Sequence, residues 1–119
     1  MATGYEVRII TLLDAQDVSA NGPWRAVGRL LSPTVCIQGL EAGGNVSIRV
    51  SNRLEKLADG TPNFPADDDL GVPHALLGNV TADMAGGLGG AFTFIRAIKT
   101  QGPDPVSNTT VTLQAQQAK

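Results

Sequence analysis

Apolar and polar side chains alternate most regularly between residues 43 and 53. After the turn-forming pair Gly43-Gly44, the apolar residues Val46, Ile48 and Val50 are separated by single polar residues. A period of two is typical of a β-strand with one face on a core and the other in water. This stretch therefore predicts a half-buried strand, whose core further strands of the chain are expected to share.

Other segments show the same alternation or are rich in β-branched and aromatic residues, which favour strands. The additional predicted strands cover residues 5–13, 24–31, 34–40, 74–82, 91–100 and 108–115. In the last of them, Val111, Leu113 and Ala115 are expected to face inward. In the first, the alternation slips at Ile9-Ile10, as it does at a β-bulge or where a strand passes from the edge of a sheet to the interior.

These segments predict an all-β fold. Helical spacing of apolar residues occurs only over residues 54–58, a stretch too short to be trusted as a helix. Fourteen Gly and seven Pro supply the turns that connect short strands. We expect one domain over residues 1–119, folded as an antiparallel β-sandwich (Ig-like or jelly-roll-like) of about six or seven strands. A small closed β-barrel is the alternative.

Four segments outside the strands are expected to be irregular. Residues 1–4 are predicted to form a flexible arm, and residues 116–119 a frayed tail. Residues 83–90 are rich in glycine and predict a flexible loop. Residues 54–73 lack any periodicity, and a connection of that length in a small domain tends to be functional or mobile.

Charge argues against nucleic-acid and membrane partners. The net charge is −2, and the basic residues are scattered instead of clustered, so the chain lacks the footprint of a protein that binds nucleic acid or anionic lipid. No apolar run approaches the roughly 20 residues of a membrane span. The first residues lack the pattern of a secretory signal. We therefore expect a soluble protein that is made in the cytoplasm.

The residue types that carry chemistry are few and lie apart. Cys36 is the only cysteine and is interpreted as a small buried hydrophobe. His74 is the only histidine, so no zinc site or nucleophilic triad can be assembled with any specificity. The glycines of residues 86–90 precede a predicted strand instead of the helix that a phosphate-binding loop requires. The carboxylates of residues 67–69 are consecutive and lack the alternating spacing of a calcium loop.

From these observations the sequence predicts no catalytic residue, no cofactor and no metal, and we expect a protein that is not an enzyme.

Three stretches together resemble a known family. They are residues 44–52 (Gly-Asn-Val-Ser-Ile-Arg-Val-Ser-Asn), 92–97 (Phe-Thr-Phe-Ile-Arg-Ala) and 110–113 (Thr-Val-Thr-Leu). In this order they are similar to small β-sandwich capsid decoration (cement) proteins of tailed bacteriophages, over about residues 43–115. The long segment 54–73 departs from that pattern.

The resemblance implies a non-enzymatic virion structural protein on the capsid surface. Such a protein binds the outside of the shell, stabilises contacts between subunits of the major capsid protein of the same phage, and forms a homo-oligomer, a dimer or trimer.

The irregular segments and interface-prone residue types supply candidate partner-binding residues. These candidates are Tyr5, Arg53, Phe64, Asp67 and Leu88. Phe64 could instead anchor its loop on the body of the domain, and Trp24 could belong either to an interface or to the core.

Two other roles fit the same fold. A tail, fibre or head–tail connector component would use a similar sandwich at lower copy number. A small ligand- or carbohydrate-binding module would need exposed aromatic side chains in a groove, and the chain has only Trp24, Tyr5 and three Phe.

Overall fold

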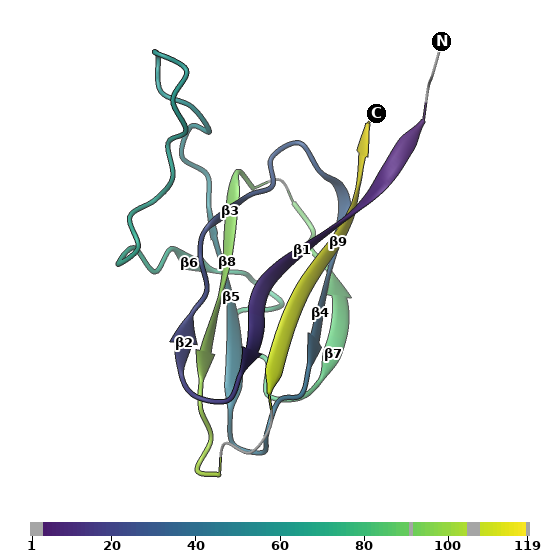
Figure 1. The fold of residues 1–119 in the computed structure, drawn as a ribbon, viewed down its shortest axis with the longest axis vertical. Coiled ribbons are helices and arrows are strands. Elements are labelled where there is room, and N and C mark those ends of the chain that lie inside the picture. Colours follow the sequence, from purple (N-terminus) through teal and green to yellow (C-terminus); the bar gives the residue numbers. More distant parts are fainter. Residues whose placement is uncertain (1–3, 91, 105–107, 119) are drawn as a thin grey trace.

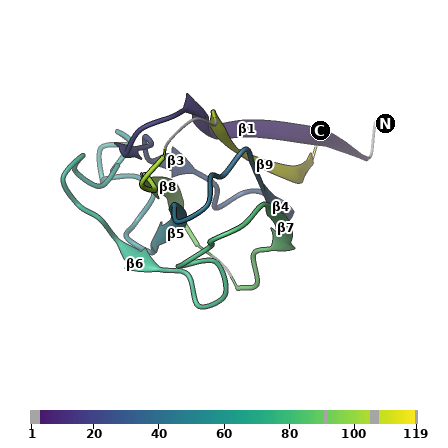
Figure 2. The same cartoon turned by 90° about the horizontal axis from the view of Figure 1, so that it is seen from below.

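Two antiparallel sheets packed face to face make up the protein (Figures 1 and 2). The computed structural model describes residues 4–90, 92–104 and 108–118, and these residues form nine strands and no helix. The strands are β1 (Tyr5–Gln16), β2 (Ala20–Asn21), β3 (Arg25–Ala26), β4 (Leu31–Gln38), β5 (Asn45–Ser51), β6 (Val72–Pro73), β7 (Met84–Gly87), β8 (Phe94–Thr100) and β9 (Thr109–Ala118). Within this described part, no helix is long and apolar enough to cross a membrane.

The order of the strands gives each sheet open edges. One sheet has four strands in the order β1-β9-β4-β7, and the other has five, with β2-β8-β5-β6 in line and β3 also paired with β8. Neither sheet closes on itself, so the fold is the predicted β-sandwich and not the alternative barrel. In Figure 1 the start of β1 and the end of β9 extend together beyond the body of the sandwich.

The core lies between the sheets and is built from alternate residues of the long strands. Val46, Ile48 and Val50 of β5 are at most 7% exposed, as the period of two predicted. The inward residues of β9, namely Val111, Leu113 and Ala115, are confirmed in the same way.

The prediction that the other face of β5 lies in water is wrong. Ser47 is buried and Arg49 is half-buried, with the Arg49 Nε–H donating a 2.8 Å hydrogen bond to Ser47 Oγ. The neighbouring strand β8 is buried on both faces: Ile95 and Ala97 belong to the core, while Phe94 lies on the opposite face. The long loop of residues 52–71 covers part of that outer face, where it contacts Phe94 and Arg96.

A bulge is present in β1, slightly later than the sequence predicts. The register with β9 shifts between Thr11 and Leu13, so that Leu12 and Leu13 are both buried although they are consecutive. An inserted residue changes the phase of a strand. Before the shift, residues 5–11 pair with β9 in unbroken register.

Two predicted strands are mostly absent. Of residues 24–31, only the short β3 and the first residue of β4 are strand. Ser32 and Pro33, which separate the predicted strands 24–31 and 34–40, lie inside β4. Ser32 takes a left-handed φ of 51°, which accommodates the register shift between Leu31 and Thr34. Residues 74–82 form turns, joined to β5 by an isolated bridge between Val80 and Val46.

Three segments expected to be irregular contain strand. The short β6 occupies the last two residues of the predicted irregular segment 54–73. β7 lies within the predicted glycine-rich loop 83–90, because its backbone pairs with β4 and this pairing needs no large side chains. Residues 116–118 of the predicted frayed tail belong to β9, where they pair with residues 5–7 of β1. This pairing includes Tyr5, which is a strand residue as predicted. Gly4 precedes β1, and the rest of the predicted arm, like residue 119 of the tail, lies outside the described residues.

One end of the core holds a buried ion pair. The Lys99 Nζ lies 2.7 Å from Glu41 Oε1, and the two side chains are 0% and 3% exposed. The same Nζ donates a 2.8 Å hydrogen bond to the carbonyl oxygen of Gln16 at the end of β1. The hydrogen bond from Lys99 lowers the pKa of the Glu41 carboxyl below its usual range, against the opposing effect of burial. The pair therefore ties β8, the turn before β5 and the end of β1 together.

Loss of this pair is expected to destabilise the fold and to flatten its acid response. The stabilisation from a carboxyl with a lowered pKa is complete above the ordinary glutamate pKa, about 4.3, and is lost as the pH falls through the lower folded value. Glu41→Gln should reduce the free energy of unfolding near neutral pH by about 2–3 kcal/mol, because Lys99 stays buried without its counter-ion. Urea unfolding between pH 7 and pH 3 measures both effects.

The double variant Glu41→Leu/Lys99→Met is the control, since it removes both charges and should recover much of the lost stability. Equal acid sensitivity in wild type and Glu41→Gln would contradict the assignment.

Candidate interaction surfaces

The outer face of the four-stranded sheet carries no charged side chain at its centre. Strand register places nine outward residues there, contributed by β1, β9, β4 and β7. We call this set the uncharged face: Tyr5, Val7, Ile9, Thr34, Cys36, Ala85, Thr112, Gln114 and Gln116. All nine are exposed or half-buried. A surface without charge can be covered by a partner at low desolvation cost.

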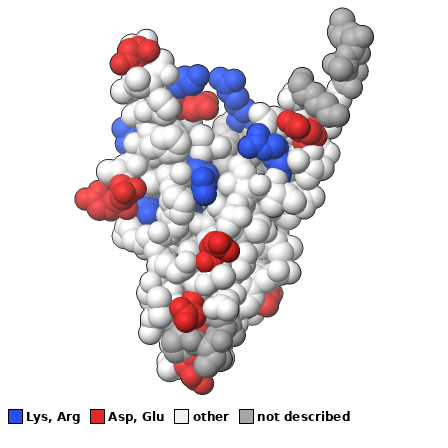
Figure 3. Space-filling view, in the orientation of Figure 1, with Lys and Arg blue, Asp and Glu red and all other residues white. Residues whose placement is uncertain are grey.

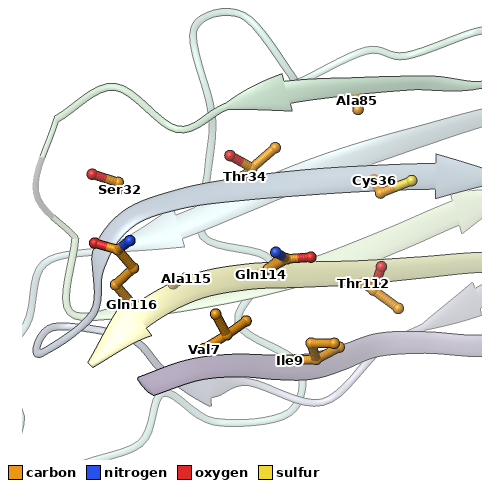
Figure 4. A pocket seen from close by; sticks show the side chains of 10 residues that line it. All are labelled: Val7, Ile9, Ser32, Thr34, Cys36, Ala85, Thr112, Gln114, Ala115 and Gln116. Atoms are coloured by element: carbon orange, nitrogen blue, oxygen red, sulfur yellow. The ribbon is translucent and has the colours of Figure 1, made fainter. Parts of the chain in front are cut away.

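The middle of the uncharged face is hollowed into an open groove of about 500 Å³. Figure 4 shows side chains from all four strands around it, with Val7 and Ile9 on one side and Ala85 on the other. Cys36 lies in this groove and is half-buried. Its interpretation as a core residue is wrong, because Val35 and Ile37 take the inward positions and the period of two turns Cys36 outward.

The most apolar part of this surface lies on β1. Tyr5, Val7 and Ile9 are 58%, 60% and 67% exposed, and they share the outward side of the strand. Adjoining apolar side chains on the surface of a soluble protein mark sites of protein–protein contact more often than scattered ones do. This stripe is therefore the strongest structural indication of a contact surface.

Charge is distributed without a dominant sign. In the view of Figure 3, basic side chains lie in the upper half among acidic ones, the lower half shows only isolated acidic side chains, and uncharged areas separate them, so no continuous field of one sign is visible. A surface of this kind does not favour steering toward a polyanion.

A second surface is the long loop of residues 52–71, which covers part of the outer face of β8. Phe64 packs on Phe94 of β8 with the ring centroids 5.1 Å apart, yet it remains 47% exposed. Phe64 therefore anchors its loop on the body of the domain, as one of the two alternatives predicted. The exposed half of its ring is still accessible to a partner.

Arg96 of β8 holds the loop in place from beneath. Its side chain donates hydrogen bonds to three backbone carbonyl oxygens: Nε to Gly22 at 3.0 Å, and Nη1 to Asp67 at 2.9 Å and Asp69 at 2.8 Å. The guanidinium lies 5.2 Å from the ring centroid of Trp24, whose Nε1–H donates to the Asp69 carbonyl at 3.2 Å. Burial lowers the pKa of Arg96, while the nearby charges of Asp67 and Asp69 oppose that shift.

These contacts define the roles of two predicted residues. Trp24 is 5% exposed and belongs to the packing under the loop, not to an exposed contact surface. Asp67 is exposed and serves the fold through its backbone carbonyl, since that oxygen and not its carboxylate accepts the bond from Arg96.

The remaining candidate residues lie in different environments. Arg53 is exposed and donates a 2.8 Å hydrogen bond to Asn63 Oδ1 within the loop. Leu88 is only 6% exposed and packs in the core, so its assignment as an exposed contact residue is wrong. The cause is the pairing of β7 with β4, after which the Leu88 N–H donates to the Pro33 carbonyl and the side chain turns inward. Of the five candidate residues, only Tyr5 belongs to the uncharged face.

His74 has a structural role in the turn after β6. Its Nδ1 accepts hydrogen bonds from the backbone N–H groups of Leu76 and Leu77, both at 3.2 Å, and its ring packs edge-on against Phe92. The side chain is 5% exposed. Among the residues that the structure describes, no three His, Cys, Asp or Glu side chains are grouped so that they could hold a metal ion.

Comparison with known proteins assigns the fold. No protein-family model matches the sequence, and no curated protein sequence matches it significantly. The architecture is that of an antiparallel two-sheet β-sandwich. The structure is similar to the crystal structure of SPBc2 prophage-derived protein YomS, with a TM-score of 0.57 and 15% sequence identity over 98% of each chain. At this identity the likeness concerns the fold alone.

The uncharged face could not be recognised from the sequence because its residues lie on four strands. The alternation of Tyr5, Val7 and Ile9 was the available sequence signal, because it predicts that one side of this strand is apolar. That this apolar side faces outward follows only from the structure, because the bulge after Thr11 and the register with β9 decide which side chains of β1 point away from the core.

Arg96 is expected to control the position of the loop. Arg96→Met should cost about 3 kcal/mol of unfolding free energy, because carbonyl groups under the loop lose their donor. Chymotrypsin should then cut the loop at the exposed Leu57 or Leu70 much faster than in wild type. Arg53→Met, which removes an exposed cation within the same loop, should change stability by less than about 0.5 kcal/mol. Equal cleavage of both variants would contradict the role of Arg96.

Proposed function

We propose that this protein is a non-enzymatic structural component of a bacteriophage virion. It binds the outside of the capsid through its uncharged face and stabilises contacts between subunits of the major capsid protein. The observation that carries the proposal is the hollowed, charge-free sheet face with Tyr5, Val7 and Ile9 exposed along one side. A broad neutral surface on a rigid sheet suits a partner that is itself a large and regular surface.

The likeness to a prophage-derived protein supports the phage context of this proposal, because the two folds agree over 98% of each chain. The resemblance of three sequence stretches to capsid decoration proteins supports the capsid as the partner. If many copies bind one shell symmetrically, their individually modest contacts together give stable attachment.

A structural role is also supported by the contacts of the ionisable side chains. His74 bonds the backbone of its own turn, and Lys99 pairs with Glu41 inside the fold. The groove is lined by aliphatic, hydroxyl, thiol and amide side chains without an aromatic ring. That composition differs from the aromatic platform that a carbohydrate-binding module would use.

Copy number in purified virus particles tests the proposal directly. Quantitative mass spectrometry should find hundreds of copies per particle, in a simple ratio to the major capsid protein. A few copies per particle would assign the protein to the tail or the head–tail connector instead. Absence from the particle would overturn the virion role.

A charge placed in the groove should weaken attachment to the shell. Gln114 is exposed at the centre of the uncharged face, so Gln114→Lys should leave stability within about 0.5 kcal/mol of wild type. Binding to shells assembled without the protein should weaken by about tenfold or more, because the lysine would be desolvated without a partner. Leu76→Lys, at a site that is 78% exposed and away from this face, is the matched control. Equal loss in both variants would contradict the assignment of the surface.

A further inference from the structure

The outer edge of β1 is open along a regular stretch. β1 is the end strand of its sheet and pairs only with β9, so the backbone groups on its other side have no strand partner in the described chain. Residues 5–11 keep unbroken register with β9, and the bulge comes only after Thr11. An edge of this kind is a template for pairing with another strand.

The usual protection of an open edge is only partly present here. Natural edge strands are blunted by Pro, by Lys, by bulges or by inward-pointing charges. Residues 5–11 (Tyr-Glu-Val-Arg-Ile-Ile-Thr) contain no Pro and no Lys. Tyr5, Val7 and Ile9 present apolar side chains on the outward side of the strand. Glu6 and Arg8 lie on the inward side, since Arg8 pairs with the core residue Ala115, and both of these charged side chains remain exposed.

The order of these residues is complementary to itself. In an antiparallel pair of identical strands related by a twofold axis, a central residue lies opposite its own copy. With Val7 at the centre, Glu6 faces Arg8 of the second copy and Arg8 faces Glu6, so both charged pairs have opposite sign. On the other side, Tyr5 lies opposite Ile9 of the second copy, next to the central valine pair.

The neighbouring registers lack this match. A centre at Glu6 places two glutamates directly opposite each other, and a centre at Arg8 does the same with two arginines. Like charges directly opposite each other destabilise a strand pair. A shift by one residue between opposed strands would set side chains of opposite faces against each other, which pleated strands do not allow.

We propose that β1 pairs antiparallel with β1 of a second copy of this chain, centred on Val7, so that two four-stranded sheets become one continuous sheet. The two uncharged faces then lie on the same side of the joined sheet. The hydrogen bond from Arg8 Nη1 to Gln117 Oε1, at 2.6 Å, is compatible with this pairing, because a guanidinium has further donors for the partner's Glu6.

The expected dimer is reversible. A single pair of strands buries less surface than a stable obligate interface, so association in the micromolar range is expected. The inference concerns purified protein alone and does not rest on the proposed capsid role, which is tested on particles. Failure of one leaves the other standing.

Charge reversal tests the register. Glu6→Arg alone and Arg8→Glu alone each put like charges opposite each other in both pairs. Each variant should weaken the dimer by about tenfold or more in sedimentation velocity across a concentration series. The double variant Glu6→Arg/Arg8→Glu restores opposite charges and should dimerise like wild type. An equimolar mixture of the two single variants should form a heterodimer.

Both side chains are exposed, so the variants should melt within a few degrees of wild type in circular dichroism. A wild-type protein that stays monomeric at all concentrations would overturn the proposal. Single variants that dimerise as tightly as wild type would also overturn it, since the dimer would then form through another surface.

A disulfide at the centre gives an independent test. Residues opposite each other in an antiparallel pair have Cα atoms about 4.5 or 5.5 Å apart, within the range of about 4.4–6.8 Å that a disulfide needs. Val7→Cys, in a Cys36→Ser background, should form a covalent dimer under mild oxidation. Leu54→Cys, at a position that is 78% exposed on the loop, is the control. Equal cross-linking of both variants would overturn the pairing.

Discussion

The burial of β8 on both faces is the constraint on which the rest of the structure depends. One face contributes Ile95 and Ala97 to the core, and the long loop covers part of the other. The strand also carries two cations, Arg96 and Lys99, that are almost completely buried. A buried cation without partners costs several kcal/mol. The loop must therefore bring backbone carbonyls to Arg96, and the turn before β5 must bring Glu41 to Lys99.

This constraint makes the two sheets unequal. The five-stranded sheet has much of its outer face covered by the chain itself, with Phe64 on Phe94 and Trp24 over Arg96. The four-stranded sheet has no such cover over its groove, and its outward side chains are threonine, glutamine and apolar residues. A partner can therefore approach a complete, rigid sheet on that side. The buried network on the opposite side keeps the scaffold in one shape.

The uncharged face and the open edge of β1 meet at Val7 and Ile9, so the two proposed contacts are physically related. Edge pairing uses the backbone and the alternating charges of Glu6 and Arg8, while the face uses side chains that point away from the sheet. In the proposed dimer the two faces would form one surface of twice the area. A shell with regularly spaced subunits could then be held at two points, which raises affinity without new kinds of contact.

The sequence by itself determined the fold class, because a period of two in β5 and β9 leaves one apolar side that only a second sheet can cover. It could not identify the strands that depend on pairing. The sequence of β7 has no strand pattern of its own and forms a strand by pairing with β4, and Gln117 and Ala118 at the end of β9 pair with β1. Cys36 and Leu88 show the same limit: Cys36 was expected to be buried but lies in the groove of the outer face, and Leu88 was expected at a partner contact but packs in the core. Only the tertiary structure decided which side of each strand faces outward. Strand register and bulges decide where each side chain points, and segments distant in the sequence, such as the long loop over β8, decide which faces are covered.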